Sequence, residues 1–276
     1  MKLLTVASAL LFADAALGAR FTEKRRAAFA KRGGAAVAAR AGRGNPLLPA
    51  EPSPEAEVAA STNGTADVEY SSNWSGAVLI STGFTSVTGT FVVPTPRAPA
   101  GGRASTEYAA SAWVGIDGDT AQNSILQTGV DFYIQNGQAS YDAWYEWFPD
   151  FAFTFTGFAI SANDTITVTV TASSKSAGTA VIENVSTGRT VRHSFSSESN
   201  TLEELNAEWI VEDFEEGGSL VPFANFGTVT FTDATAQRNG ATVGPSGSTL
   251  IDIKQGSQVL TSASLSGDDV VVSYTA

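Results

Sequence analysis

The sequence lacks cysteine altogether and contains one histidine, His193, among its 276 residues. Without cysteine the chain cannot form disulfides, thiolate metal sites, iron–sulfur clusters or a thiol nucleophile. A single histidine excludes a histidine-rich zinc site, and a Ser/His/Asp triad would have to use His193 itself. That residue lies in the alternating segment TVRHSFSS, which is typical of an ordinary strand. Catalysis would therefore rely on carboxylates, amides and hydroxyls, and we expect neither a metal nor a cofactor.

Basic residues are also scarce, at 16 Lys and Arg against 28 Asp and Glu, so the net charge is −12. Nucleic acids and anionic membranes require a cationic face, so neither is expected as the main partner. The charges are unevenly distributed. Residues 1–60 hold 9 basic and 5 acidic residues, which leaves 7 basic and 23 acidic residues, a net charge of −16, for residues 61–276. Nothing in the sequence indicates an oligomer, and we expect a monomer.

The N-terminal composition predicts a secreted, processed protein. Lys2, the apolar run LLTVASALLFA and the small residues Ala16-Leu17-Gly18 indicate a signal peptide over residues 1–18. Residues 19–66 are rich in Ala, Arg and Lys and then in Pro, which predicts a basic propeptide and linker that docks on the acidic body and inhibits it. A disordered basic tail is the alternative. No apolar run approaches the roughly 20 residues of a membrane-spanning helix.

Residues 67–276 show a continuous β pattern. Short alternating segments rich in Thr, Val and aromatic residues are separated by Gly, Asn, Ser and Asp turns. Only the segment TLEELNA suggests a helical turn. Many strands without long helices predict an all-β fold, a β-sandwich of two packed antiparallel sheets.

Alternation along four segments predicts two unlike strand faces. One face is apolar, as with Ala112, Val114 and Ile116. The opposite face combines aromatic, acidic and amide side chains with glycine, and comprises Trp113, Gly115 and Asp117; Gln127, Gly129 and Asp131; Asp142, Trp144, Glu146 and Phe148; and Glu208, Ile210, Glu212 and Phe214. If these faces share one sheet, they form a site with aromatic walls and convergent polar groups.

A carboxylate and a carboxamide can together hydrolyse an amide bond. The carboxylate takes a proton from water, the amide N–H groups stabilise the oxyanion, and the carboxylic acid then protonates the leaving nitrogen. Because an unperturbed carboxyl titrates near pH 4, such a site would work in acid. The residue types alone do not decide between Gln127 with Glu212 and the other acids of this face.

Five motifs in order resolve that choice through a resemblance. The segments SNWSGAVL, AWVGIDGD, ILQTGVDFY, YDAWYEWFP and NAEWIVEDFEE resemble the fungal glutamic peptidases, or eqolisins, from about Asn73 to the C-terminus. The resemblance implies a secreted acid endopeptidase that cleaves proteins, is insensitive to pepstatin and is made as a zymogen. It also implies a concanavalin-like sandwich of two seven-stranded sheets with a cleft on the concave face.

The same resemblance assigns residues. It places the catalytic pair at Gln127, in ILQTG, and Glu212, in EDF. It places residues that line the cleft or support the pair at Trp74, Trp113, Asp117, Asp131, Trp144, Glu146 and Phe214. Glu208 matches the pattern but receives no role. The segment YIQNGQAS is longer than expected for the family and predicts a loop that alters the cleft.

Two alternatives use the same residues. A jelly-roll glycoside hydrolase would use two carboxylates with stacking tryptophans, and a carbohydrate-binding sandwich would need the tryptophans alone. The hydrolase interpretation depends on the spacing of Glu146 and Glu212 and is disfavoured by the motif match, and the carbohydrate-binding interpretation gives no reason for Gln127 opposite Glu212. Four Asn-x-Ser/Thr sequons mark possible glycosylation sites, at Asn63, Asn73, Asn163 and Asn184.

Overall fold

A computed structural model describes residues 68–216 and 219–276. The predicted signal peptide (1–18), the predicted propeptide and linker (19–66) and Asn63 lie outside the described residues. All the regular elements of the described part are β-strands. The segment TLEELNA is not helical, so that prediction is wrong. Its residues Thr201–Leu205 are irregular, and β11 begins at Asn206.

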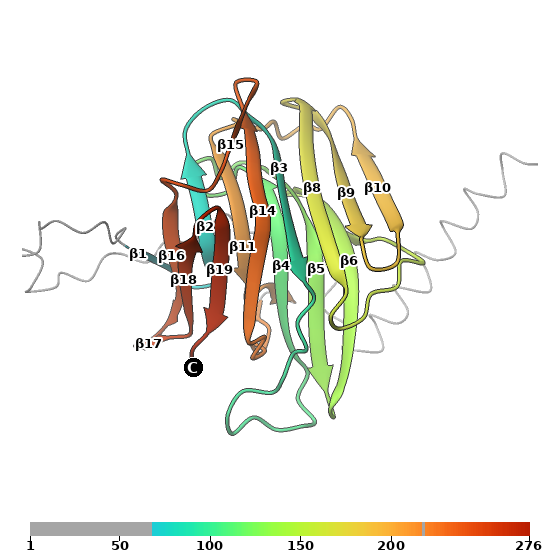
Figure 1. The fold of residues 1–276 in the computed structure, drawn as a ribbon, viewed down its shortest axis with the longest axis vertical. Coiled ribbons are helices and arrows are strands. Elements are labelled where there is room, and N and C mark those ends of the chain that lie inside the picture. Colours follow the sequence, from blue (N-terminus) through green and yellow to red (C-terminus); the bar gives the residue numbers. More distant parts are fainter. Residues whose placement is uncertain (1–67, 217–218) are drawn as a thin grey trace, which may run out of the picture.

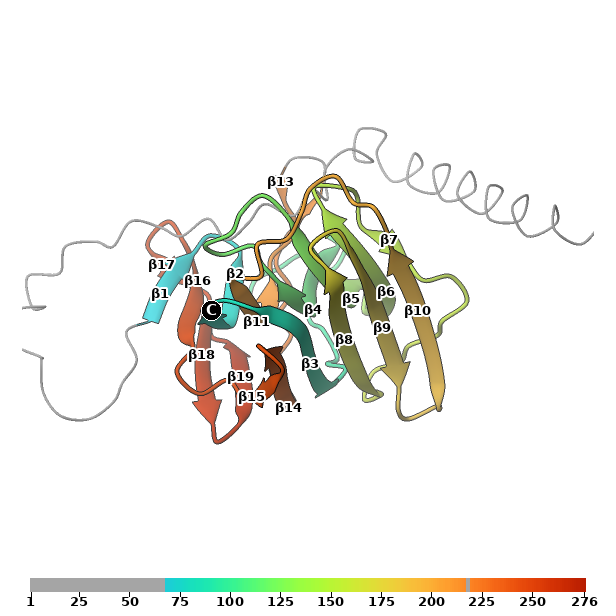
Figure 2. The same cartoon turned by 90° about the horizontal axis from the view of Figure 1, so that it is seen from above.

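The strands form two large sheets that pack face to face (Figures 1 and 2). The first sheet contains, in spatial order, β1 (Val68–Ser71), β16 (Thr249–Gln255), β2 (Trp74–Ile80), β11 (Asn206–Glu212), β4 (Tyr108–Ile116), β5 (Ile125–Gln135), β6 (Gln138–Phe148) and β7 (Phe153–Thr154), with β17 (Gln258–Val259) paired to β16. Neighbours are antiparallel except β1 and β16, which are parallel.

The second sheet contains, in spatial order, β10 (Arg189–Phe195), β9 (Ala177–Asn184), β8 (Thr165–Ser174), β3 (Phe84–Val92), β14 (Thr228–Arg238), β19 (Asp269–Tyr274) and β18 (Thr261–Ser266), with β15 (Ala241–Val243) paired to β14. A separate hairpin joins β12 (Glu215–Glu216) to β13 (Ser219–Leu220). The predicted sandwich of antiparallel sheets is confirmed. Short edge strands raise the sheets to nine and eight strands instead of about seven.

Strand alternation explains how each sheet is stabilised. In β8, Ile166, Val168 and Val170 are buried between the sheets, while the intervening threonines face outward. Two of these threonines bond to threonines on β3, with Oγ1–Oγ1 distances of 2.7 Å between Thr169 and Thr88 and 2.9 Å between Thr167 and Thr90. The buried side chains drive packing, and the outward hydroxyl pairs fix the register.

The main core lies between the two sheets. Its largest side chain from β11 is Trp209, whose Nε1–H donates to the carbonyl of Thr88 on β3 at 2.8 Å and so links the sheets without an unpaired polar atom. A second, smaller cluster lies on the other face of the first sheet, the face turned away from the second sheet, and comprises Trp74, Val78, Trp113, Ile125, Trp144, Ile210 and Ile251. We call this face the site face.

The segment YIQNGQAS is not an extended loop, so the loop prediction is wrong. Strands β5 and β6, of eleven residues each, form a hairpin that turns over Asn136 and Gly137. Both have positive φ, 52° and 75°, the backbone geometry of a tight two-residue turn that matches strand twist. The segment therefore continues the two paired strands into a tight turn and adds no irregular chain.

His193 has the structural position that its sequence context predicts. It lies on β10, and its ring stacks on that of Tyr145 from β6 with a centroid distance of 4.0 Å and an interplanar angle of 11°. Burial lowers its pKa below the ordinary histidine value. The residue therefore helps to close one end of the sandwich, where β6 of the first sheet meets β10 of the second.

No helix within the described ranges is long and apolar enough to cross a membrane.

Candidate active site

Strand register brings the predicted polar faces together on the site face. Because paired strands are aligned residue against residue, the side chains form rows that run across β11, β4, β5 and β6. The Gln127 row contains Glu208, Gly115, Gln127 and Glu146; the Trp113 row contains Ile210, Trp113, Gly129 and Trp144; and the Glu212 row contains Trp74, Glu212, Ser111, Asp131 and Asp142. The four faces predicted from alternation thus share one surface.

Glu212 ends β11 and is held by two nitrogen donors. Asn73 Nδ2 donates to Glu212 Oε1 at 3.1 Å, and Trp113 Nε1 donates to Oε2 at 2.9 Å. N–H groups can only donate, so this arrangement suits an ionised carboxylate and fixes its orientation. Glu212 retains 9% exposure, whereas Glu208, four residues earlier on the same face, retains none. Glu212 is therefore the glutamate of β11 that can reach a water or a substrate.

Asn73 was not assigned a role in the site from the sequence, where it was noted only as a sequon. Its side chain is oriented by Ser71, whose Oγ donates to Asn73 Oδ1 at 3.2 Å and accepts from the backbone N–H groups of Asn73 and Trp74. This turn between β1 and β2 leaves Nδ2 free to point at Glu212. The available signal was the position of Asn73 directly before Trp74 in a motif of the resemblance.

Gln127 lies near the middle of the first sheet, between Gly115 and Glu146 in its row. It is 3% exposed, and its Oε1 is buried without a hydrogen-bond partner among the described residues. Gln127 and Glu212 are on strands separated by β4 and in rows separated by the Trp113 row. Trp113 lies between them: its row partner Gly129 has no side chain, and a Cβ added there would lie 2.4 Å from Trp113 Cβ. Gln127 and Glu212 therefore lie on either side of Trp113 on the same sheet face.

Three tryptophans form the walls of the site. The rings of Trp74 and Trp113 meet edge to face at a centroid distance of 4.8 Å and an angle of 78°. Trp144 donates from Nε1 to Ser111 Oγ at 3.2 Å. All three are at most 2% exposed. They are too deeply buried to act as open stacking platforms for a sugar, and they serve instead to position the polar groups beside them.

Two further predicted residues support the site from its margins. Tyr133 donates from its hydroxyl to Asp131 Oδ2 at 3.0 Å, and the Tyr133 ring packs against that of Phe214 at 6.1 Å. Phe214 follows Glu212 by two residues and is buried. The contact therefore joins the end of β11 to β5, the strand that carries Gln127.

Asp117 lies just beyond the end of β4 and organises backbone. Its carboxylate accepts from the backbone N–H groups of residues 203 to 206, at 2.6, 2.9, 2.7 and 3.2 Å. Burial raises its pKa above the ordinary value, and the four bonds oppose that rise. Asp117 thus fixes the irregular segment that leads into β11, and so sets the start of the strand that carries Glu208 and Glu212.

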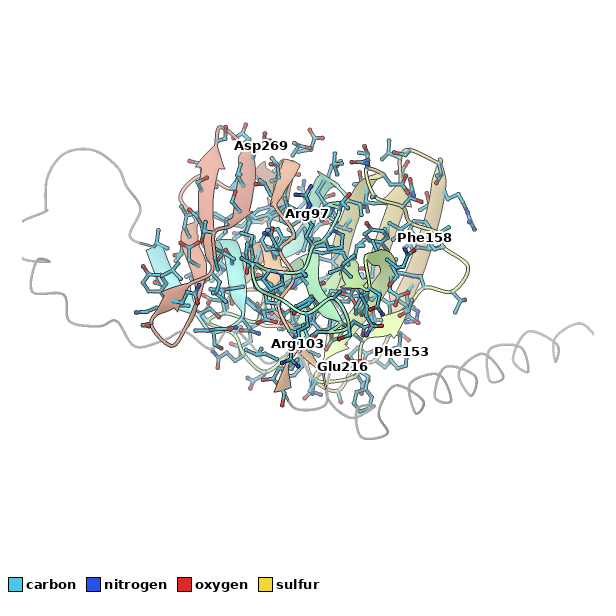
Figure 3. All side chains as sticks on the ribbon, turned by 90° about the horizontal axis from the view of Figure 1, so that it is seen from below. Arg97, Arg103, Phe153, Phe158, Glu216 and Asp269 are labelled. Carbon is cyan, nitrogen blue, oxygen red and sulfur yellow. The ribbon has the colours of Figure 1, made fainter. Side chains whose placement is uncertain are left out.

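The margin of the site face carries mixed chemistry. Figure 3 shows Arg103, Glu216 and Phe153 along the border of the first sheet, with Asp269 at the far side of the molecule in the second sheet. Phe153 on β7 is 49% exposed and stacks on Tyr145 at 5.9 Å.

No group of acids or histidine that could hold a metal ion occurs in residues 68–216 and 219–276.

Two of the predicted glycosylation sites are buried in the fold. Asn73 Nδ2 bonds to Glu212, and Asn184 is wholly buried with its Nδ2 donating to Asp164 Oδ2 at 2.8 Å. A glycan on either nitrogen would break these bonds. Asn163 is exposed in the turn before β8 and has room for one.

Comparison with known proteins decides the family. The sequence model of the Peptidase A4 family matches residues 72–274. The chain belongs to the peptidase A4 family. It is 53% identical to aspergillopepsin-2 of Aspergillus niger, over 99% of this chain and 100% of that protein. It is 44% identical to scytalidopepsin B of Scytalidium lignicola, over 74% of this chain and 78% of that protein.

Solved peptidase A4 structures share the fold. Scytalido-glutamic peptidase with a transition-state analogue inhibitor superposes with a TM-score of 0.68 at 43% identity, covering 74% of this chain and 98% of that one. Aspergilloglutamic peptidase from Aspergillus niger superposes with a TM-score of 0.60 at 60% identity, covering 61% of this chain and 99% of that one. The resemblance to glutamic peptidases is therefore confirmed, and the chain is a peptide hydrolase of this family.

Proposed function

We propose that this peptidase is a secreted acid endopeptidase in which Glu212 and Gln127 act together on the scissile peptide bond. The observation that carries the proposal is the carboxylate of Glu212, fixed by Asn73 and Trp113 on the same sheet face as the carboxamide of Gln127. A carboxylate that accepts N–H donors in this way is suited to its ionised form, which can accept a proton.

The proposed reaction uses both side chains. Glu212 takes a proton from a water molecule, and the resulting oxygen attacks the peptide carbonyl carbon. The oxyanion that forms accepts a hydrogen bond from Gln127 Nε2. Glu212, now protonated, gives that proton to the leaving nitrogen, the C–N bond breaks, and the carboxylate is restored. General acid–base help of this kind is worth about 10²–10⁴-fold, and one oxyanion donor about 10²–10³-fold.

The test is digestion of an acid-denatured protein between about pH 2 and 5, the range in which an ordinary carboxyl titrates. We expect cleavage in the presence of pepstatin, and a loss of about 10²-fold or more when Gln127 is replaced by alanine, because the oxyanion loses its donor. Folding of each variant is checked by circular dichroism. A folded, leader-free wild type that cleaves glucans and no protein would overturn the proposal.

We propose further that residues 19–66 form an inhibitory propeptide of the domain 67–276, removed to give an active monomer. The leader is basic and the body carries −16, so attraction is strong when the carboxyls are ionised and fades as they protonate. A synthetic 19–66 peptide should inhibit the mature protein near neutral pH and lose potency as the pH falls. Absence of inhibition at every pH contradicts this proposal, and sedimentation of the mature protein tests the monomer.

A further inference from the structure

Glu208 is a buried glutamate that the proposed reaction leaves unused. It precedes Glu212 by four residues on β11, and its side chain points to the same site face. In the cross-strand register it is paired with Gly115, which is paired in turn with Gln127. Glu208 and Gln127 are therefore next-but-one neighbours in one row, separated by two interstrand spacings of about 4.8 Å each.

The residue between them has no side chain, and the carboxyl of Glu208 occupies the vacant position. A Cβ added at Gly115 would lie 2.6 Å from Glu208 Oε1 and 2.8 Å from Trp113 Cζ3. The carboxyl thus leans over β4 in the direction of Gln127. Gly115 has an ordinary strand conformation, so glycine is required here for the space above it.

Three acceptor atoms in this row have no donor within the described ranges. Both carboxyl oxygens of Glu208 are buried without a hydrogen-bond partner, and so is Gln127 Oε1. Burying polar oxygens unpaired is costly, and an ionised Glu208 would make the cost larger. Protonation of Glu208 lowers this cost. One carboxyl oxygen then becomes an O–H donor, and Gln127 Oε1 in the same row is an acceptor without a donor.

We propose that Glu208 is a positioning residue whose neutral carboxyl donates to Gln127 Oε1 across Gly115. Burial, together with the nearby acids Asp117 and Asp119, raises the pKa of Glu208 well above its ordinary value, which keeps the proton in place. Glu146, on the other side of Gln127 in the row, is the remaining acid beside the amide.

The consequence concerns which way the amide of Gln127 faces. A carboxamide can rotate by half a turn and exchange its oxygen for its NH₂ group. With Oε1 bound to the Glu208 hydroxyl, Nε2 is directed away from Glu208 and is available to the oxyanion that the proposed reaction forms. This inference rests on the proposed role of Gln127. It adds that the role depends on a proton held by a glutamate that never touches the substrate.

Two substitutions of Glu208 distinguish the orientation of the Gln127 amide from the packing of the residue-208 side chain. Glu208→Gln retains an N–H donor for Gln127 Oε1, so its kcat should stay within about threefold of wild type. Glu208→Leu has no donor, so kcat should fall by about tenfold or more while KM stays nearly unchanged, because the loss is felt mainly in the transition state. A folded Glu208→Leu with wild-type kcat overturns the proposal, as does a Glu208→Gln that is as slow as the leucine variant.

Asp252→Asn serves as the matched control for removing a buried acid. Asp252 lies on β16, two strands from β11, and accepts the backbone N–H of Ala263 at 2.6 Å, which asparagine can also do. The kcat of Asp252→Asn should match that of wild type. In a Gln127→Ala background, Glu208→Leu should cause no further loss of kcat, because the group that it orients is gone. An additive loss would contradict the proposal.

Infrared spectroscopy gives a readout that does not depend on the leucine variant folding. The difference spectrum between wild type and Glu208→Gln at about pH 5 should contain the carbonyl band of one protonated carboxyl. A carboxylate band in its place overturns the inference. If Gln127→Ala retains full activity, the proposed function fails whatever Glu208 does; if Gln127→Ala is inactive and Glu208→Leu is not, only the present inference fails.

Discussion

Replacement of Glu212 by glutamine should lower kcat by about 10³–10⁴-fold, near the upper end for general acid–base catalysis, because the same group acts first as base and then as acid. Glutamine has nearly the same shape and keeps one oxygen, so it still accepts from Asn73 or Trp113. Its NH₂ group, however, faces the other N–H donor and cannot take a proton from water. The variant should therefore bind substrate with a KM close to wild type and fail in the chemical step.

The measurement is steady-state cleavage of a fluorogenic peptide in acid, with wild type and variant compared at equal folded concentration. Glu183→Gln is the control, because it makes the same chemical change at an exposed position on β9 of the second sheet. It should retain wild-type kcat. If Glu212→Gln keeps more than about a tenth of wild-type kcat, Glu212 is not the proton acceptor, since even modest general-base help exceeds that factor.

The free energy of unfolding should be greatest in acid and should decrease by several kcal/mol as the pH approaches 8. Burial raises the pKa of Asp213 to about 8 and that of Asp252 to about 6, and it raises the pKa of Glu208 well above the ordinary value. In the unfolded chain these groups ionise near pH 4. Between pH 4 and the folded pKa, the folded state binds the extra proton, so stability falls as the pH rises, by up to about 1.4 kcal/mol per pH unit for the well-buried Asp213. The contribution of Asp252 is smaller because solvent screens it.

The sign of this dependence defines the test. Stability from Asp252 is complete below about pH 4 and is lost as the pH rises through about 6; stability from Asp213 is lost through about 8. Denaturant unfolding at pH 4, 6 and 8 should show the decline. Asp213→Asn should make the decline less steep up to about pH 8, whereas Asp252→Asn should make it less steep only up to about pH 6, and the other buried acids should keep part of the slope in both variants. A wild-type stability that rises between pH 4 and 8 would contradict the assignment.

Much of the site could be predicted because alternation is a local property. In a strand, the residue number alone decides the face, so Trp113 with Gly115 and Gln127 with Asp131 were assigned correctly to the face opposite the core. The shared sheet could not be derived from alternation, since it depends on which strands pair. The resemblance supplied that link, and the registers between β11, β4, β5 and β6 confirm it.

The errors have a different physical origin. TLEELNA contains good helix formers, but Glu204 has a positive φ of 64°, which a right-handed helix does not allow. The carboxylate of Asp117, more than 80 residues earlier, holds the backbone there by accepting the N–H groups of residues 203 to 206. Tertiary context overrides local propensity there. Asn73 was missed for a related reason. Its partner Glu212 lies 139 residues away, and no local pattern reports such a distance.

The 139 residues between Asn73 and Glu212 also affect the stage of folding at which the site is completed. The Asn73–Glu212 bond requires β2 and β11 to be paired, and β11 enters the middle of the sheet between β2 and β4, which precede it by about a hundred residues. Closing such a long stretch of chain is entropically slow. Strands β4, β5 and β6 can associate as neighbours first, with Gln127 already in place. Glu212 is then the last part of the site to arrive, so a chain in which β11 has not yet paired lacks the proposed proton acceptor.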